Sequence, residues 1–289
     1  IISDRISIMR DGKYIKTVNT KDVSRAELIA MMAGRALDAQ YPGRVPEIGE
    51  AILEVEDAAG NGDSGLNFTL HRGEILGFAG LVGAGRTEAM QLIYGVAPLK
   101  SGSIRINGKE YKFKHPSEAI AAGVGMIPED RKNQGVFLEQ TIRWNSVINV
   151  IKRISHFGVV DTRKEKEIAE DYQKRFSIKA PSLDQLVNNL SGGNQQKVAL
   201  AKSMAAESEI IIFDEPTRGI DVATKYDIYV LMNELVAQGK AILMVSSEMP
   251  ELIGMCDRIV VLSERHQVGI VEKEQFSQEY ILDLASGSN

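Results

Sequence analysis

Length, composition and charge limit the classes of protein to which this chain can belong. Its 289 residues suffice for one large domain or two modest ones, with 44% hydrophobic and 25% charged residues, as in ordinary globular proteins. The net charge of −5 does not favour binding of nucleic acid through bulk positive charge. The single cysteine, Cys256, excludes an internal disulfide and favours a reducing, cytoplasmic setting. No apolar run approaches the ~20 residues that span a bilayer.

The two ends of the chain share a repeat. Asp4–Gly34 aligns without a gap with Asp257–Gly287, and both stretches begin with Asp-Arg-Ile. Because the chain also starts without a methionine, we expect it to be a piece of something longer. We predict that residues 1–36 are the tail of a preceding module, that residues 37–50 are a linker with two prolines and two glycines, and that residues 51–289 form a complete second module.

Short apolar runs alternate with helical patterns through the second module. Strands are expected at residues 51–57, 73–80, 121–130, 210–213 and 241–248, and on both sides of the Asn107–Gly108 turn. Helices are expected at residues 86–94, across much of 133–189, at 195–206, and where Ile228, Leu231, Met232, Leu235 and Val236 follow helical spacing. The charged run 161–176 is typical of a solvated helix face. This alternation predicts a mainly parallel α/β sheet.

A glycine-rich stretch follows the strand expected at residues 73–80. It nearly matches the phosphate-binding pattern G-x-x-x-x-G-K-[ST], with Gly80, Gly85 and Thr87 in place and Arg86 where lysine is expected. Such a turn aims backbone N–H groups and a helix N-terminus at one point, which favours a phosphate. A glycine-rich turn without a ligand is the alternative at this stage. A dinucleotide fold is less favoured, since its glycine pattern and its acidic residue are not clearly present.

An apolar strand ends in two adjacent carboxylates, Asp214 and Glu215. In a phosphate-hydrolysing site the first would hold Mg²⁺ and the second would orient the attacking water. An ordinary helix cap is the alternative interpretation. The glycine-rich loop upstream favours the phosphate interpretation.

The segment Leu190–Gln196, with the sequence LSGGNQQ, precedes a helix just before the Asp-Glu strand. Ser191 and the N–H groups of Gly192 and Gly193 form a second anion-binding helix start. This segment resembles the signature of ATP-binding cassette (ABC) ATPases, and DEP with GIDVATK (Gly219–Lys225) strengthens the resemblance. The resemblance covers residues 51–289, and the repeat covers the remainder.

The resemblance implies a fold and two cofactors. The fold is an α/β ABC ATPase (P-loop NTPase) core with a mainly parallel sheet, an antiparallel β subdomain and a helical subdomain at about residues 133–190. In this family two cassettes pack head to tail, and each ATP, with Mg²⁺, lies between the phosphate loop of one cassette and the signature of the other.

The resemblance also assigns roles to individual residues. Nucleotide-binding positions are Gly80, Gly83, Ala84, Gly85, Arg86, Thr87, Glu88 and Glu129, and the magnesium ligands are Thr87 and Asp214. Catalytic positions are Glu215 and Ser247. The signature residues that act on the partner site are Ser191, Gly192, Gly193 and Gln195, and Asp221 lies in the D-loop, which contacts the partner cassette.

Three residues depart from the family pattern within one nucleotide site. Arg86 replaces lysine, Glu129 stands where glutamine is usual, and Ser247 stands where histidine is usual. Arginine is not a like-for-like phosphate ligand, and serine is too short to reach the γ-phosphate as histidine would. No aromatic residue stands between Ala58 and Gly65, where the family often stacks the adenine. We therefore expect weak binding or slow hydrolysis here, while the intact signature completes the partner's site.

The segments GLVGAGRTE, EDRK and LSGGNQQK resemble the second cassette of tandem ATP-binding proteins from bacterial ribose- and galactose-type importers. That subgroup implies a peripheral position on the cytoplasmic face of the membrane. Its partners would be the preceding ABC module, transmembrane permease subunits and, indirectly, a sugar-binding protein, with no nucleic acid. The alternatives are a soluble ABC ATPase of translation or DNA repair, which usually has long charged insertions absent here, and a regulatory module without hydrolysis.

Overall fold

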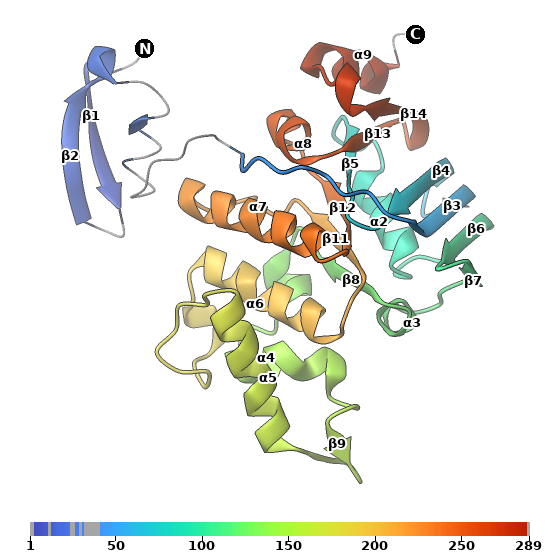
Figure 1. Ribbon diagram of the computed structural model, residues 1–289, viewed down its shortest axis with the longest axis horizontal. Helices are drawn as coiled ribbons and strands as arrows, with labels where there is room; N and C mark the ends of the chain where they lie inside the picture. Colours follow the sequence, from blue (N-terminus) through green and yellow to red (C-terminus); the bar gives the residue numbers. More distant parts are fainter. Residues whose placement is uncertain (1–2, 11–12, 24–26, 29–30, 32–40, 288–289) are drawn as a thin grey trace.

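The computed structural model describes residues 3–10, 13–23, 27–28, 31 and 41–287. Its main sheet contains β3 (Ala51–Gly60), β4 (Asp63–His71), β5 (Ile75–Gly80), β6 (Ser101–Ile106), β7 (Lys109–Tyr111), β8 (Val124–Ile127), β11 (Ile210–Asp214), β12 (Ala241–Val245), β13 (Arg258–Ser263) and β14 (His266–Glu272). The strand order is β7-β6-β3-β4-β14-β13-β5-β12-β11-β8 (Figure 1).

The half of the sheet from β13 to β8 is parallel throughout. All residues of β8, β11 and β12 are buried, as expected for a parallel sheet covered on both faces. The carboxyl ends of β5, β11 and β12 therefore lie at one edge of the sheet. This brings the loops that follow these strands together and positions the candidate site.

The other half, from β7 to β4, is antiparallel, so the predicted mixture of a parallel core and an antiparallel β subdomain is confirmed. The turn predicted at Asn107–Gly108 joins β6 to β7. Both residues have positive φ, 49° and 71°, as the two central residues of a type I′ turn require.

The α-helices are α2 (Arg86–Ile93), α3 (Pro116–Ala121), α4 (Ile142–Val147), α5 (Thr162–Arg175), α6 (Gly192–Ala205), α7 (Val222–Ala237), α8 (Met249–Met255) and α9 (Gln278–Ser286). Single turns lie at η1 (Thr20–Asp22), η2 (Arg131–Gly135), η3 (Ile148–Val150), η4 (Val187–Asn189) and η5 (Lys273–Gln275). Helices α4, α5 and α6 pack on one another as a helical layer (Figure 1). Among the described residues, no helix is both long and apolar enough to cross a membrane.

Two sequence expectations within the helical layer need correction. The stretch 133–189 also contains a hairpin, β9 (Ser155–His156) and β10 (Val159–Val160), because Phe157 and Gly158 both adopt positive φ and turn the chain. Helix α6 begins at Gly192 rather than at residue 195, so the signature glycines belong to its first turn. The expected helices at α7 and α5 are confirmed. The five spaced apolar residues of α7 are buried. In α5 only Glu165 and Ala169 are buried, as expected for a solvated helix face.

The repeat is visible in the described part of the N-terminal segment. Strands β1 (Arg5–Arg10) and β2 (Lys13–Asn19) form an antiparallel hairpin followed by η1. Strands β13 and β14, followed by η5, have the same lengths and spacing, and each hairpin shifts register at the matching position, between Ile8 and Met9 and between Val261 and Leu262. The remainder of the first repeat lies largely outside the described residues, and the module boundary stays a prediction.

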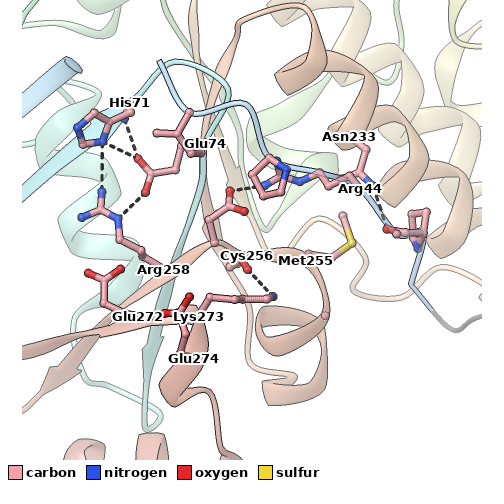
Figure 2. Close-up of a pocket in the computed structure, with 16 residues that line it drawn as sticks. Arg44, His71, Glu74, Asn233, Met255, Cys256, Arg258, Glu272, Lys273 and Glu274 are labelled. Atoms are coloured by element: carbon pink, nitrogen blue, oxygen red, sulfur yellow. Dashed lines mark hydrogen bonds and ion pairs between the residues drawn. The ribbon is translucent and has the colours of Figure 1, made fainter. Parts of the chain in front are cut away.

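Residues 41–50, the described part of the predicted linker, contain no helix or strand, as their prolines and glycines predicted. They nevertheless lie against the cassette. The Arg44 guanidinium donates to the Asp257 carboxylate, and Asn233 Nδ2 donates to the Pro42 carbonyl at 3.0 Å (Figure 2). The Gly49 N–H donates to the Arg72 carbonyl at 2.8 Å.

A cavity of about 780 Å³ lies beside this linker segment (Figure 2). Its walls are joined by polar contacts. Arg258 Nε donates to Glu74 Oε1 at 2.7 Å, and Lys273 Nζ donates to the Cys256 carbonyl at 2.7 Å. The predicted linker lines part of this cavity through Pro42, Gly43, Arg44, Pro46 and Ile48.

Candidate functional site

The glycine-rich loop, residues 80–87, joins β5 to α2 as predicted. Gly83 and Gly85 have φ of 84° and 99°, a conformation that glycine adopts without strain. A side chain at Gly80 would come within 2.8 Å of Ala84 Cβ and 2.7 Å of the Leu262 carbonyl. The tight loop ends at the N-terminus of α2, where backbone N–H groups and the helix dipole favour an anion.

Arg86, which stands at the expected lysine position, is turned toward the end of β12. Its Nη1 donates to the Ser246 carbonyl at 2.6 Å, and its Nη2 lies 3.9 Å from Glu215 Oε1. Only 13% of the side chain is exposed. A cavity of about 400 Å³ opens beside it, lined by the loop, by residues 246–250 and by α9. The loop cation is thus engaged by protein groups of its own cassette.

Glu215 follows β11 in a strained conformation, with φ of +49°. Ser247 Oγ donates to Glu215 Oε2 at 2.9 Å, while Arg86 lies near the other carboxylate oxygen. The structure therefore brings together both residues predicted to be catalytic. Ser247 contacts the carboxylate, so its short side chain can orient Glu215 from this position.

Asp214 and Thr87 meet beneath the loop. Thr87 Oγ1 donates to Asp214 Oδ1 at 3.2 Å, and the buried Asp214 Oδ2 has no hydrogen-bond partner. Burial raises the pKa of Asp214 to about 6, and the hydrogen bond from Thr87 opposes this by lowering the pKa. A carboxylate and a hydroxyl are the hard oxygen ligands that Mg²⁺ prefers, so this pair fits the metal. Elsewhere in the described chain, no cluster of three His, Cys, Asp or Glu side chains is spaced for a metal.

Glu129 stands at the usual glutamine position, in the segment after β8. Its carboxylate forms an ion pair with Arg218, four residues after Asp214. Arg131 Nη1 in turn donates to the Arg218 carbonyl at 3.0 Å. The sequence did not identify Arg218, because no sequence pattern links it to Glu129.

The remaining loop positions face the β13–β14 turn. The Arg265 N–H donates to the Ala84 carbonyl at 3.1 Å, and Arg265 Nη2 donates to Glu88 Oε1 at 3.0 Å. Asp63, also missed from the sequence, lies against Gly85 with 3% exposure and no partner for either carboxylate oxygen. Burial raises its pKa to about 7, helped by the charge of Glu88 and opposed by that of Arg265.

The signature residues lie at the start of α6, where the N–H groups of a helix N-terminus favour an anion. Ser191 is exposed, and its hydroxyl accepts from Asn194 Nδ2 at 3.0 Å but makes no capping hydrogen bond to a backbone N–H of the helix. Gly193 is packed against Thr224, and Gln195 is buried and donates to the Val187 carbonyl at 3.2 Å. Gly193 and Gln195 therefore hold the helix in place, while Ser191 at its start is exposed.

Gly192 and Asp221 lie beside this surface. Arg131 Nη2 lies 2.6 Å from where a Gly192 side chain would begin. Asp221 caps α7 by accepting from the Thr224 N–H at 3.0 Å. No hydrogen bond or ion pair within the described residues joins the signature to the glycine-rich loop.

The sequence pattern of the family described as ABC transporter matches residues 64–218. With the loop, the Asp-Glu pair and the signature in these positions, the chain belongs to the ABC transporter family. Its fold is similar to a nucleotide-free ATP-binding cassette from an ABC transporter, with a TM-score of 0.68 at 20% identity over 81% of this chain and 98% of that one.

Two relatives resemble the chain over nearly its whole length. The ribose import ATP-binding protein RbsA of Lactococcus lactis subsp. cremoris is 43% identical over 286 residues, which are 99% of this chain and 58% of that protein. A putative ribose/galactose/methyl galactoside import ATP-binding protein of Rhizobium meliloti is 43% identical over 98% of this chain and 57% of its own length. The chain thus spans a little over half of these relatives.

Proposed function

We propose that this chain carries the second cassette of a tandem ATP-binding protein, preceded by the last residues of the first cassette. The matching hairpins at β1–β2 and β13–β14, with the same register shift, support this division. The greater length of the relatives also supports it, since the chain covers 58% of the Lactococcus protein. In this proposal residues 37–50 connect the two cassettes.

The phosphate loop of this cassette binds MgATP weakly and turns it over slowly. The observation that carries this conclusion is the 2.6 Å hydrogen bond from Arg86 to the Ser246 carbonyl, because it engages the loop cation with an acceptor of its own chain. Thr87 and Asp214 hold Mg²⁺, which supplies charge neutralisation at the phosphates. Glu215 orients the attacking water, but Ser247 offers no imidazole beside it.

The signature segment serves the other site of the assembly. Its exposed Ser191 and the free start of α6 present hydrogen-bond donors outward. In a head-to-tail arrangement these donors meet the ATP held by the phosphate loop of the preceding cassette. Asp221 and the residues around it lie on the same contact surface.

Energy from ATP is coupled to the import of a monosaccharide of the ribose or galactose class. The names and similarity of the Lactococcus and Rhizobium proteins support this substrate class. The chain lies on the cytoplasmic face of the membrane as a peripheral subunit. The helical layer after Glu129 contacts permease subunits, which receive sugar from an external binding protein, and no nucleic acid takes part.

Binding and turnover of MgATP test the proposal for this cassette. Wild type, Arg86→Lys and Glu215→Gln are compared by calorimetry and by phosphate release. Lysine is shorter than arginine and would lose the hydrogen bond to the Ser246 carbonyl. Its ammonium group would then be available to the phosphates, so Arg86→Lys is expected to tighten MgATP binding. Wild-type turnover is expected to be negligible and unchanged in Glu215→Gln. Ready hydrolysis that Glu215→Gln abolishes would make Arg86 a working phosphate ligand and overturn the proposal.

Copurification tests the transport assignment separately. The tandem protein is expected to copurify with an integral membrane permease from detergent-solubilised membranes. Recovery with ribosomes or DNA, and without a permease, would favour the soluble alternative.

A further inference from the structure

Glu251, on α8, is a buried carboxylate on which several donors converge. It is 1% exposed. Its Oε1 accepts from the Thr217 hydroxyl, from the Tyr229 hydroxyl at 2.5 Å and from Lys225 Nζ at 3.4 Å. Its Oε2 accepts from the Ser246 hydroxyl at 2.7 Å. A buried charge is tolerated only with such partners, so this carboxylate fixes the groups that surround it.

One side of this network leads into the nucleotide site. The Ser246 hydroxyl donates to Glu251 at 2.7 Å and accepts from the Glu248 N–H at 3.0 Å, so it is engaged both as a donor and as an acceptor. The carbonyl of the same residue holds Arg86 at 2.6 Å. Glu251 therefore sets the position of the acceptor that holds the phosphate-loop cation.

The other side leads out to the linker. The Tyr229 ring packs against the Tyr41 ring, with centroids 5.3 Å apart and planes tilted by 50°. Tyr41 also lies so close to Gly254 that any side chain there would strike its ring. Because Tyr229 is 3% exposed and hydrogen-bonded to Glu251, a displacement of Tyr41 must disturb this buried pair.

We propose that Glu251 is a positioning residue of the nucleotide site, and that it couples Tyr41 of the linker to Arg86 through Tyr229 and Ser246. The proposal rests on the proposed function, in which residues 37–50 connect two cassettes. Movement of the preceding cassette would pull on Tyr41 and thereby change where Arg86 is held. The nucleotide site of this cassette would thus respond to the position of its neighbour.

A double-mutant cycle tests the inner half of the network. Glu251→Gln removes the charge at nearly constant size, and Arg86→Ala removes the cation that the network positions. We expect Glu251→Gln to change the affinity for a fluorescent ATP analogue by about fivefold to tenfold in the wild-type background. The same substitution is expected to have no effect in the Arg86→Ala background. Equal effects in both backgrounds would show a general structural role and overturn the proposal.

Hydrogen exchange without nucleotide tests the outer half, and its result stands even if the chain binds no ATP. Tyr41→Ala is compared with Tyr41→Phe, which keeps the ring, and with Tyr14→Ala, a change at a tyrosine that is 64% exposed on the N-terminal hairpin. Tyr41→Ala is expected to speed exchange in peptides covering residues 80–90 and 244–252. Tyr41→Phe and Tyr14→Ala are expected to leave both peptides unchanged. Unchanged exchange in Tyr41→Ala would overturn the coupling, whatever the affinity for nucleotide.

Discussion

Glu129 forms an ion pair with Arg218, so the carboxylate at the usual glutamine position is held by a residue just after the Asp-Glu pair. This pairing neutralises the charge of the Glu129 carboxylate. It also links the segment after β8 to the segment after β11. The departure at Glu129 is therefore matched by a cation of the same chain.

Glu129→Gln is expected to leave the Mg²⁺ dependence of nucleotide binding unchanged, because this carboxylate is already paired with Arg218. Asp214→Asn, at the buried position proposed as a metal ligand, is expected to weaken that dependence by about tenfold or more. Titration of Mg²⁺ at fixed nucleotide measures both. If Glu129→Gln matches Asp214→Asn, Glu129 is a metal ligand and the ion pair breaks when nucleotide binds.

Asp63 predicts a pH dependence of stability. Its pKa is about 7 in the folded chain against an ordinary value of 3.8. The folded state therefore binds more protons, and the stability that this group contributes is complete below pH 3.8 and lost as the pH rises through about 7. Asp63→Asn removes the penalty, so its gain in Tm over wild type is expected to be larger at pH 8 than at pH 5. Asp283→Asn, at an exposed position, is the control, and an Asp63→Asn shift equal at both pH values would refute the assignment.

Arg44→Ala tests whether the contact between the proposed linker and the rest of the chain contributes to stability. The two side chains of the Arg44–Asp257 pair are 15% and 13% exposed, so the variant leaves a largely buried carboxylate without its cation. The free energy of unfolding is expected to fall by about 1–3 kcal/mol in urea denaturation. Arg163→Ala breaks an exposed pair with Glu167 and is expected to cost at most about 0.5 kcal/mol. Equal losses would mean that the linker contact contributes nothing of its own.

Much of the fold could be predicted because local patterns carry it. The spacing of Ile228, Leu231 and Met232 gave the buried face of α7, and Asn107–Gly108 marked the turn between β6 and β7. The glycine-rich loop and the Asp-Glu pair were placed because each follows an apolar strand of a parallel sheet.

The remaining features depend on contacts between distant segments. Nothing in the sequence shows that Glu129 meets Arg218, that Asp63 is buried against Gly85, or that Glu251 gathers four donors. The prolines and glycines of the linker predicted the absence of regular structure. They could not predict the contact between Tyr41 and Tyr229, which depends on how α7 lies on the sheet.

The most direct test of the central claim compares the signature and the Asp-Glu pair of this cassette in the complete tandem protein with its permease. The measurement is the rate of phosphate release from ATP by the reconstituted complex, for Ser191→Arg and for Glu215→Gln. We predict that Ser191→Arg abolishes hydrolysis, because it blocks the site completed by the signature, and that Glu215→Gln retains most of it. Loss of hydrolysis in Glu215→Gln with full activity in Ser191→Arg would contradict the account.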